Sequence, residues 1–204
     1  MSFITAYCRI SKELVIVNGE IIFRKDEISA DDFTKQIYKN SKLDYSKFYK
    51  MDLLSKFAFL GTEILKAHSK KITEYGDDEI ALLFSNSVSS ADTDIKFQKS
   101  YLEEGSPSPS LFVYTLPNIL IGEIAIRNKW FGENLFTIFP KFDSDFFANY
   151  CNILLSKNTE ACLCGWINIL DENVDVFLFF VEKTEVNRIN SPLNSEALSI
   201  LYKK

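Results

Sequence analysis

The chain carries four cysteines and a single histidine, the residue types most often used as nucleophiles, general bases and metal ligands. Cys162 and Cys164 stand two residues apart, Cys151 precedes them, and Cys8 lies near the start of the sequence. No second Cys or His pair follows at zinc-ligand spacing, and any catalytic triad would have to be built around His68 alone. A metal site, a triad and a bound cofactor are therefore not expected.

Each of these residues also has an ordinary structural explanation. His68 ends a helical pattern, where a cation stabilises the carboxyl end of the helix. Cys162 and Cys164 share one face of a strand-like run, which favours buried residues that act as small apolar groups. The sequence opens without a signal segment, so the four thiols predict a cytoplasmic protein with reduced cysteines.

The composition describes a globular chain rather than a fibrous, disordered or disulfide-stapled one. It has 204 residues, of which 47% are hydrophobic and 25% charged, enough to bury a sizeable core in one domain. A formal net charge of −5 argues against a surface that tracks phosphates, so nucleic acid is not an expected partner. The longest apolar run, 174–181, is far shorter than the roughly 18 residues that span a membrane, so no membrane contact is predicted.

Alternating strand and helix patterns predict a layered α/β domain over 1–184 and a polar, peripheral C-terminal tail over 185–204. The connections between strands are long enough for crossover helices, which indicates a mixed, mostly parallel sheet of five strands with helices on both faces. The predicted strands cover 3–10, 80–84, 135–139, 161–169 and 174–181, and the last two are expected to form an antiparallel pair.

Turn and capping residues mark where several elements begin. Asn18-Gly19, between two short apolar runs, predicts a tight hairpin. Asp52 is expected to cap one helix, and Asp143 or the serine after it to cap another. The residues 105–110, which include two prolines, are expected to form a loop.

Three short motifs stand in a row: Leu-Pro-Asn at 116–118, Gly-Glu-Ile-Ala-Ile at 122–126 and Gly-Glu-Asn at 132–134. Their order and spacing resemble the β-ketoacyl-acyl-carrier-protein synthases, in which such motifs lead through one buried strand to a nucleophilic cysteine. The resemblance extends to the first of the two similar halves of this thiolase-like fold, and it implies a strand order of 3-2-1-4-5. The motif residues that match the family are Pro117, Asn118, Gly122, Gly132 and Asn134.

The nucleophile of the family is missing from this chain. The position that holds the cysteine, counted from Gly132, falls on Lys141, and an amine cannot form the thioester that holds the acyl chain. The catalytic histidines and lysine of the family belong to the second half, which the resemblance does not cover, and His68 stands on a different element. The resemblance therefore implies no catalytic residue here.

The resemblance also predicts a protein interface. In the complete fold, the helix after the nucleophile is buried between the two halves, and the strand before it is an edge strand that pairs across a two-fold axis. An ordinary core stripe explains the aromatic residues of such a helix equally well. The predicted interface residues are Leu135, Phe136, Phe139, Phe146, Phe147, Tyr150 and Leu154.

The function that the resemblance implies is that of a non-catalytic, chain-length-factor-like subunit. It would pair with a ketosynthase or another half-domain, or form a homodimer, in fatty-acid, polyketide or aryl-polyene pigment biosynthesis. One alternative is an enzyme of divergent acyl-transfer chemistry, with Lys141 as a Schiff-base or general-base residue, or with Cys151, Cys162 or Cys164 as the nucleophile.

A second alternative is a module that binds acyl-carrier protein without any role in condensation. Carrier proteins are usually acidic, as this chain is, so the contact would need a local basic patch. The candidate patch consists of Lys42, Lys47, Lys50 and Lys56.

Overall fold

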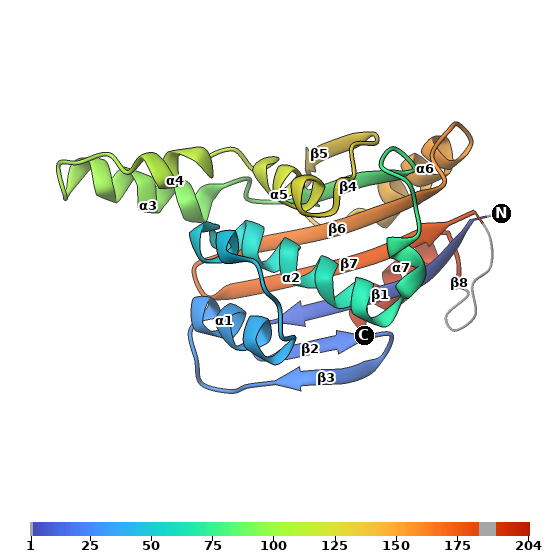
Figure 1. Ribbon diagram of the computed structural model, residues 1–204, viewed down its shortest axis with the longest axis horizontal. Helices are drawn as coiled ribbons and strands as arrows, with labels where there is room; N and C mark the ends of the chain where they lie inside the picture. The colour runs from blue at the N-terminus through green and yellow to red at the C-terminus, as the bar shows by residue number, and fades with distance from the viewer. Residues whose placement is uncertain (1, 184–190) are drawn as a thin grey trace.

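The computed structural model describes residues 2–183 and 191–204, which build an eight-stranded sheet with helices on both faces (Figure 1). Seven strands lie in the order β3-β2-β1-β7-β6-β4-β5, and β8 pairs with β1. The strands are β1 (Phe3–Ser11), β2 (Leu14–Val17), β3 (Glu20–Arg24), β4 (Ile80–Asn86), β5 (Asn134–Ile138), β6 (Ala161–Leu170), β7 (Asn173–Glu182) and β8 (Ser191–Pro192).

The sheet differs from the predicted one in strand number, order and direction. The five predicted strands are present as β1, β4, β5, β6 and β7, but they follow the order β5-β4-β6-β7-β1, and three more strands join them. Only β4 pairs in parallel, with β5 and β6, so the prediction of a mostly parallel sheet is wrong. The difference in order arises from the predicted antiparallel pair. A short turn after β6 places β7 next to β6, and β7 pairs with β1 on its other side, so that β6 and β1 are not neighbours.

The predicted hairpin is confirmed, and it extends the sheet beyond β1. Asn18 and Gly19 join β2 to β3 with φ angles of 53° and 89°. Two consecutive positive φ angles match the twist of a tight hairpin, and Asn and Gly are the residues that adopt them most readily. The Asn18 side chain also accepts a hydrogen bond from the Tyr7 amide at 2.8 Å, which fastens the turn to β1.

Helices α1, α2 and α5 cover one face of the sheet, and α6 and α7 cover the other (Figure 1). Each face therefore has its own apolar core, a larger one under α2 and a smaller one under α6. The helices are α1 (Ala30–Asn40), α2 (Leu53–His68), α3 (Ala91–Leu102), α4 (Pro109–Val113), α5 (Ile119–Asn128), α6 (Ser144–Leu155) and α7 (Ser195–Lys203), with 3-10 turns η1 (Ser46–Lys50) and η2 (Lys70–Thr73).

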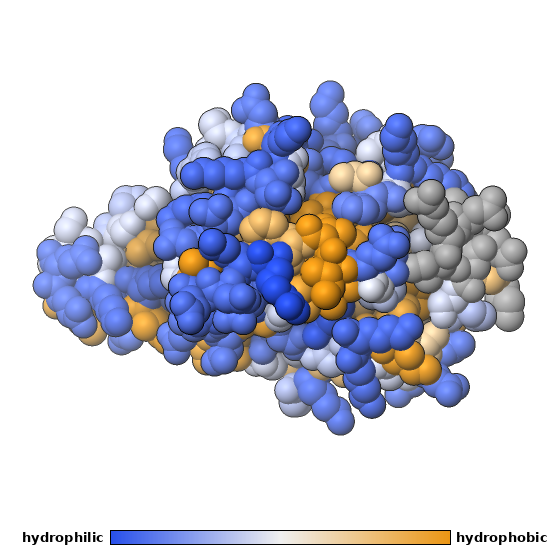
Figure 2. Space-filling view, turned by 90° about the horizontal axis from the view of Figure 1, so that it is seen from below, coloured by the Kyte–Doolittle hydropathy of each residue, from blue (hydrophilic) through white to orange (hydrophobic). Residues whose placement is uncertain are grey.

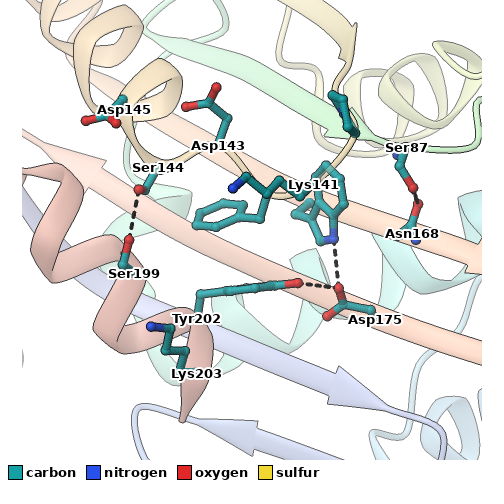
Figure 3. A pocket seen from close by; sticks show the side chains of 13 residues that line it. Ser87, Lys141, Asp143, Ser144, Asp145, Asn168, Asp175, Ser199, Tyr202 and Lys203 are labelled. Atoms are coloured by element: carbon teal, nitrogen blue, oxygen red, sulfur yellow. Dashed lines mark hydrogen bonds between the residues drawn. The ribbon is translucent and has the colours of Figure 1, made fainter.

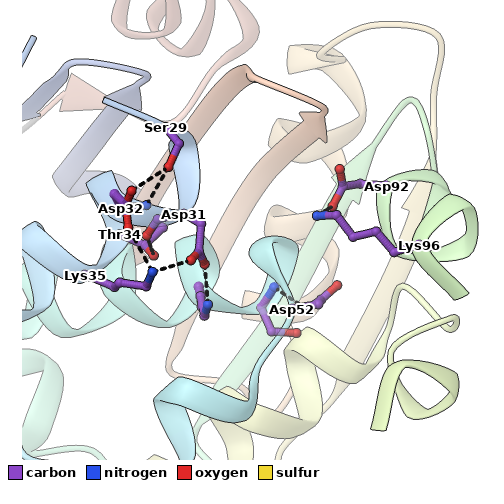
Figure 4. Close-up of polar contacts among 10 residues, drawn as sticks. Ser29, Asp31, Asp32, Thr34, Lys35, Asp52, Asp92 and Lys96 are labelled. Atoms are coloured by element: carbon purple, nitrogen blue, oxygen red, sulfur yellow. Dashed lines mark hydrogen bonds and ion pairs between the residues drawn. The ribbon is translucent and has the colours of Figure 1, made fainter. Parts of the chain in front are cut away.

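Polar contacts fix the starts of the first three helices (Figure 4). The Ser29 hydroxyl accepts a hydrogen bond from the Asp32 amide at 3.1 Å and caps α1. Asp52 caps α2 as predicted, because one carboxylate oxygen accepts from the Ser55 amide at 2.9 Å. The other oxygen accepts from the Thr93 hydroxyl at 2.8 Å, so the same carboxylate also holds α3 in place.

The end of the chain is part of the fold, in contrast to the predicted polar and peripheral tail over 185–204. The segment 184–190 lies outside the described residues, but β8 adds to the sheet and α7 packs on α6. Leu198 and Leu201 of α7 are buried in the core under α6. These two leucines are three residues apart and lie on the apolar side of an amphipathic helix.

Helices α3 and α4 form an arm, residues 91–116, that projects beyond the end of the sheet (Figure 1). The loop predicted over 105–110 is therefore shorter than expected, because Pro109 begins α4 and Ser108 caps it. On α3 only Thr93 and Ser100 are buried, and on α4 no residue is. The apolar side chains of α3 and α4 are consequently exposed or half-buried, whereas Tyr114, just after α4, is buried in the core.

Candidate functional site

Lys141, which the sequence resemblance aligned with the nucleophile position, lies in the loop between β5 and α6 (Figure 3). It lines a pocket of about 590 Å³ at the carboxyl ends of β4, β5 and β6, the end of an open α/β sheet where ligands usually bind. Aromatic and polar side chains surround it, among them Ser87, Trp166, Asn168, Asp175 and Tyr202.

The Asp175 carboxylate organises the side of the pocket that faces α7 (Figure 3). It accepts hydrogen bonds from the Trp166 indole at 2.9 Å and from the Tyr202 hydroxyl at 2.5 Å, and it pairs with Arg9 at 3.0 Å. Burial, together with the hydrogen bond to Asp175, raises the pKa of Tyr202, so the hydroxyl remains a donor at physiological pH. These contacts fasten the last turn of α7 over the sheet.

The same pocket lacks the arrangement that an amine nucleophile requires. Lys141 is exposed to solvent, whereas Schiff-base lysines are activated by burial in an apolar pocket or by a neighbouring cation. The nearby carboxylate of Asp143 is already engaged, because it caps α6 by accepting from the Phe146 amide at 2.9 Å. That cap confirms the predicted start of the helix.

The cysteines do not supply a nucleophile either. All four are free and buried. Burial raises the pKa of Cys8 to about 12 and also raises the pKa of Cys164, and the hydrogen bond to Cys151 together with burial raises that of Cys162. The Sγ atoms of Cys151 and Cys164 lie 3.2 Å apart inside the core under α6. Catalytic cysteines are accessible thiolates, and these thiols are neither accessible nor ionised near neutral pH.

The folded protein is therefore expected to resist thiol alkylation. Iodoacetamide at mildly alkaline pH should leave the folded protein unlabelled over the time in which it labels a cysteine-containing peptide completely. A Lys141→Cys variant should take up one label, because position 141 is exposed. Intact-mass spectrometry before and after unfolding in urea measures both. Rapid labelling of a native cysteine would contradict the assignment of all four to the core.

His68 occupies the position expected from the sequence. Its Nδ1 atom lies 2.8 Å from the Ile64 carbonyl oxygen in the last turn of α2. Within 2–183 and 191–204, no three His, Cys, Asp or Glu side chains form a group that could hold a metal ion. None of the described helices is long and apolar enough to cross a membrane.

The motif residues shape the backbone around β5 rather than gather at one site. Asn118 is the N-cap residue of α5, whose first helical residue is Ile119, and Pro117 precedes it. Gly122 lies within α5, and Asn134 begins β5. Gly132 permits a close approach, because a Cβ atom there would lie 2.5 Å from the carbonyl oxygen of Ile80.

The predicted interface residues fall into two groups. Phe147 and Leu154 are buried in the core under α6, which removes them from a surface in this fold and supports the core-stripe alternative for that side of the helix. The remaining five are half-buried. Leu135 and Phe136 lie on β5, Phe139 follows it, and Phe146 and Tyr150 lie on α6.

Other apolar side chains near β5 are more exposed than the predicted ones. Ile126 on α5, Phe131 before β5, Ile138 on β5 and Ile153 on α6 each expose half or more of their surface. The sequence offered one signal for Ile138, since it lies within the predicted edge strand. The other three become recognisable only once the helices flanking β5 are placed.

The basic patch predicted for carrier-protein binding does not form. Lys56 is buried and pairs with Asp31, which also binds Lys35 at 2.7 Å (Figure 4). Lys47 pairs with Glu123 at 2.8 Å. Only Lys42 and Lys50 remain exposed without an ion pair to the described residues. Two lysines are too few to attract an acidic carrier protein.

No family model matches the sequence. No curated protein sequence matches it either. Similarity appears at the level of structure, and the class of fold that it defines is that of ketosynthases and chain length factors.

Three solved structures illustrate this similarity. The ishigamide ketosynthase/chain length factor superposes with a TM-score of 0.64 at 15% identity, over 92% of this chain and 63% of that one. AntDE:AntF, a type II polyketide synthase acyl-carrier protein in complex with its ketosynthase, superposes with a TM-score of 0.60 at 11% identity, over 89% of this chain and 62% of that one. The ketosynthase ApeO in complex with its chain length factor ApeC, from Xenorhabdus doucetiae, superposes with a TM-score of 0.52 at 12% identity, over 70% of this chain and 62% of that one. The chain thus spans a little over three fifths of each of these proteins.

Proposed function

We propose that this chain is a non-catalytic, chain-length-factor-like subunit that pairs with a ketosynthase-like protein in polyketide, fatty-acid or aryl-polyene pigment biosynthesis. The fold supports the proposal, since the similar structures are ketosynthases, chain length factors and their complexes. The four free cysteines support a cytoplasmic location, where thiols stay reduced.

The observation that carries the proposal is the distribution of exposed apolar side chains. Thirteen large apolar residues of the described chain are exposed, and ten of them lie on the arm or on the elements that flank β5. Six of the ten lie on the arm and four lie on or beside β5, and exposed apolar side chains gathered on a few elements are typical of protein interaction sites. The ten residues are Ile95, Tyr101, Leu102, Phe112, Val113, Leu116, Ile126, Phe131, Ile138 and Ile153.

The pocket and the thiols support a non-catalytic role. The resemblance places Lys141 at the position of the nucleophilic cysteine, and its side chain is exposed, whereas activated amines are usually buried. The native thiols are buried with raised pKa values. In the proposed complex the ketosynthase would hold the acyl group, and an acyl-carrier protein would be a partner of the complex rather than of this chain alone.

Co-expression with each ketosynthase of the same genome tests the proposal. The expected result is a stable complex of one copy of this chain with one copy of the ketosynthase, measured by size-exclusion chromatography with light scattering. An arm variant with Phe112→Asp and Leu102→Asp serves as the matched negative control. A chain that remains unbound beside every one of those ketosynthases would contradict the proposed function.

A further inference from the structure

The hairpin of β2 and β3 has one covered face and one open face. On the covered face, Val15 and Val17 of β2 are buried in the core under α2. Among the residues that the structure describes, none from either strand belongs to the core under α6. Helices α6 and α7 therefore cover their side of the sheet as far as β1 and leave the same side of the hairpin open.

The open face carries apolar side chains at positions where a solvated face is usually polar. The strand register sets Ile16 opposite Ile21, and Leu14 opposite Arg24, on this face. Ile21 exposes 58% of its surface, and Leu14 and Ile16 are half-buried. Seen from the β3 edge, apolar atoms gather over the hairpin (Figure 2). Antiparallel strands with one face in water normally place polar residues on that face, so these three residues indicate a face that packs against a partner.

Cations border this apolar strip, Leu14, Ile16 and Ile21, on both of its sides. A groove of about 150 Å³ separates the strip from the end of α7, and its lining includes Arg9, Lys203 and Lys204 but no carboxylate. Arg9 is held by Asp175, whereas Lys203 and Lys204 make no ion pair with the described residues. Arg24, on the far side of the strip, makes none with that part of the chain either.

The charge of this surface is opposite to that of the whole chain, whose formal net charge is −5. Two carboxylates are close to the strip in sequence. Glu13 lies in the turn before β2, and Glu20 pairs with Val17 and therefore lies on the face toward α2. An apolar strip bordered by arginine and lysine is complementary to a partner that is both apolar and acidic.

The shape of the surface fits a helix rather than an added strand. At the free edge, β3 carries Glu20 and Arg24 at its two ends, and a shift in its register with β2 leaves Ile22 as an extra residue. A bulge and terminal charges keep an edge strand unpaired. Helices α6 and α7 already cover the neighbouring strands on this side of the sheet, so a helix beside α7 would continue the same layer.

We propose that the open face of the β2–β3 hairpin docks an acidic, amphipathic helix of a partner protein other than the ketosynthase. The apolar side of that helix would cover the strip, and its carboxylates would meet Arg24 on one side and Lys203 on the other. The hairpin forms the edge of the sheet opposite β5, so the two partners would occupy separate surfaces. The proposal goes beyond the proposed function and does not depend on it.

A labelled synthetic peptide is the probe for this surface. It has about 18 residues, with leucine at helical positions i, i+3, i+4 and i+7 and glutamate at most of the others. We expect fluorescence anisotropy to show saturable binding to the full chain, with a dissociation constant that rises with salt. Ile21→Asp should raise the dissociation constant about tenfold, and so should Arg24→Glu combined with Lys203→Glu, because each change sets carboxylates against the acidic helix.

Two matched variants serve as controls. Ile138→Asp makes the same change as Ile21→Asp at 55% exposure on β5, and Lys39→Glu reverses a charge on α1. Both should leave the affinity for the peptide unchanged. A second peptide with lysine in place of every glutamate should bind the variant with Arg24→Glu and Lys203→Glu more tightly than it binds the unmodified chain.

Failure of the acidic peptide to bind, or equal binding by Ile21→Asp and the unmodified chain, would overturn the proposal. Binding to vesicles that contain phosphatidylglycerol, without binding to the peptide, would also overturn it and would assign the face to a membrane surface. Circular dichroism of each variant confirms that the fold is retained. None of these results bears on the proposed function, because binding of the ketosynthase is measured separately.

Discussion

Replacing Gly132 by alanine is expected to lower the free energy of unfolding by about 2 kcal/mol, and the melting temperature by about 4–8 °C. A Cβ atom at this position would lie 2.5 Å from the carbonyl oxygen of Ile80 and 2.9 Å from that of Asp78. Both neighbours are backbone atoms at the start of β4, so no side chain can rotate away. Urea unfolding followed by tryptophan fluorescence measures the change.

Gly122 provides the matched control, because it belongs to the same set of family motifs. A Cβ atom there would meet nothing within 4 Å, and the residue lies inside α5. Gly122→Ala should therefore leave stability unchanged or raise it by up to about 1 kcal/mol, since alanine is the better helix former. If both substitutions had the same effect, the close packing of Gly132 on β4 would not be the reason for its place in the motif.

An Ile138→Asp substitution is expected to weaken binding of the ketosynthase-like partner by about a hundredfold, as the loss of a central interface side chain does. Ile138 lies on the free edge strand with 55% of its surface exposed, so the folded chain loses little packing. A carboxylate there would be buried without a partner in any strand-paired interface. Biolayer interferometry against the immobilised ketosynthase measures the affinity.

Ile21 allows a control with the same chemical change at similar exposure. It lies on β3, at the opposite edge of the sheet, and exposes 58% of its surface. Ile21→Asp should leave the affinity within about twofold of the unmodified chain, because exposed substitutions outside an interface contribute little. Equal losses in the two variants would show that β5 is not the edge that binds the partner.

Local signals in the sequence predicted the elements well. Asn18-Gly19 requires two positive φ angles, and Asp52 and Asp143 cap their helices through side-chain contacts within three residues. These features depend on neighbours along the chain, which is why residue type and spacing suffice to locate them. The resemblance carried by the motifs at 116–134 likewise led to the fold that the solved structures share.

Long-range arrangement was beyond the reach of the same signals. The order of strands in the sheet depends on which strand edges pair with one another. No single segment of the sequence therefore predicts that β7 lies between β6 and β1. The role of Leu198 and Leu201 was missed because they lie in a helix of only nine residues that follows a polar stretch of sequence. The fates of Lys56, buried against Asp31, and Phe147, buried under α6, likewise depend on residues distant in sequence.

We expect this chain to bind a ketosynthase and to take no acyl group itself. Native and denaturing mass spectrometry of the co-expressed pair, after incubation with an acyl-loaded carrier protein, tests it most directly. The expected result is a complex of one copy of each protein, with the acyl adduct on the ketosynthase and none on this chain. An acyl adduct on this chain, at Lys141 or at any cysteine, would contradict it.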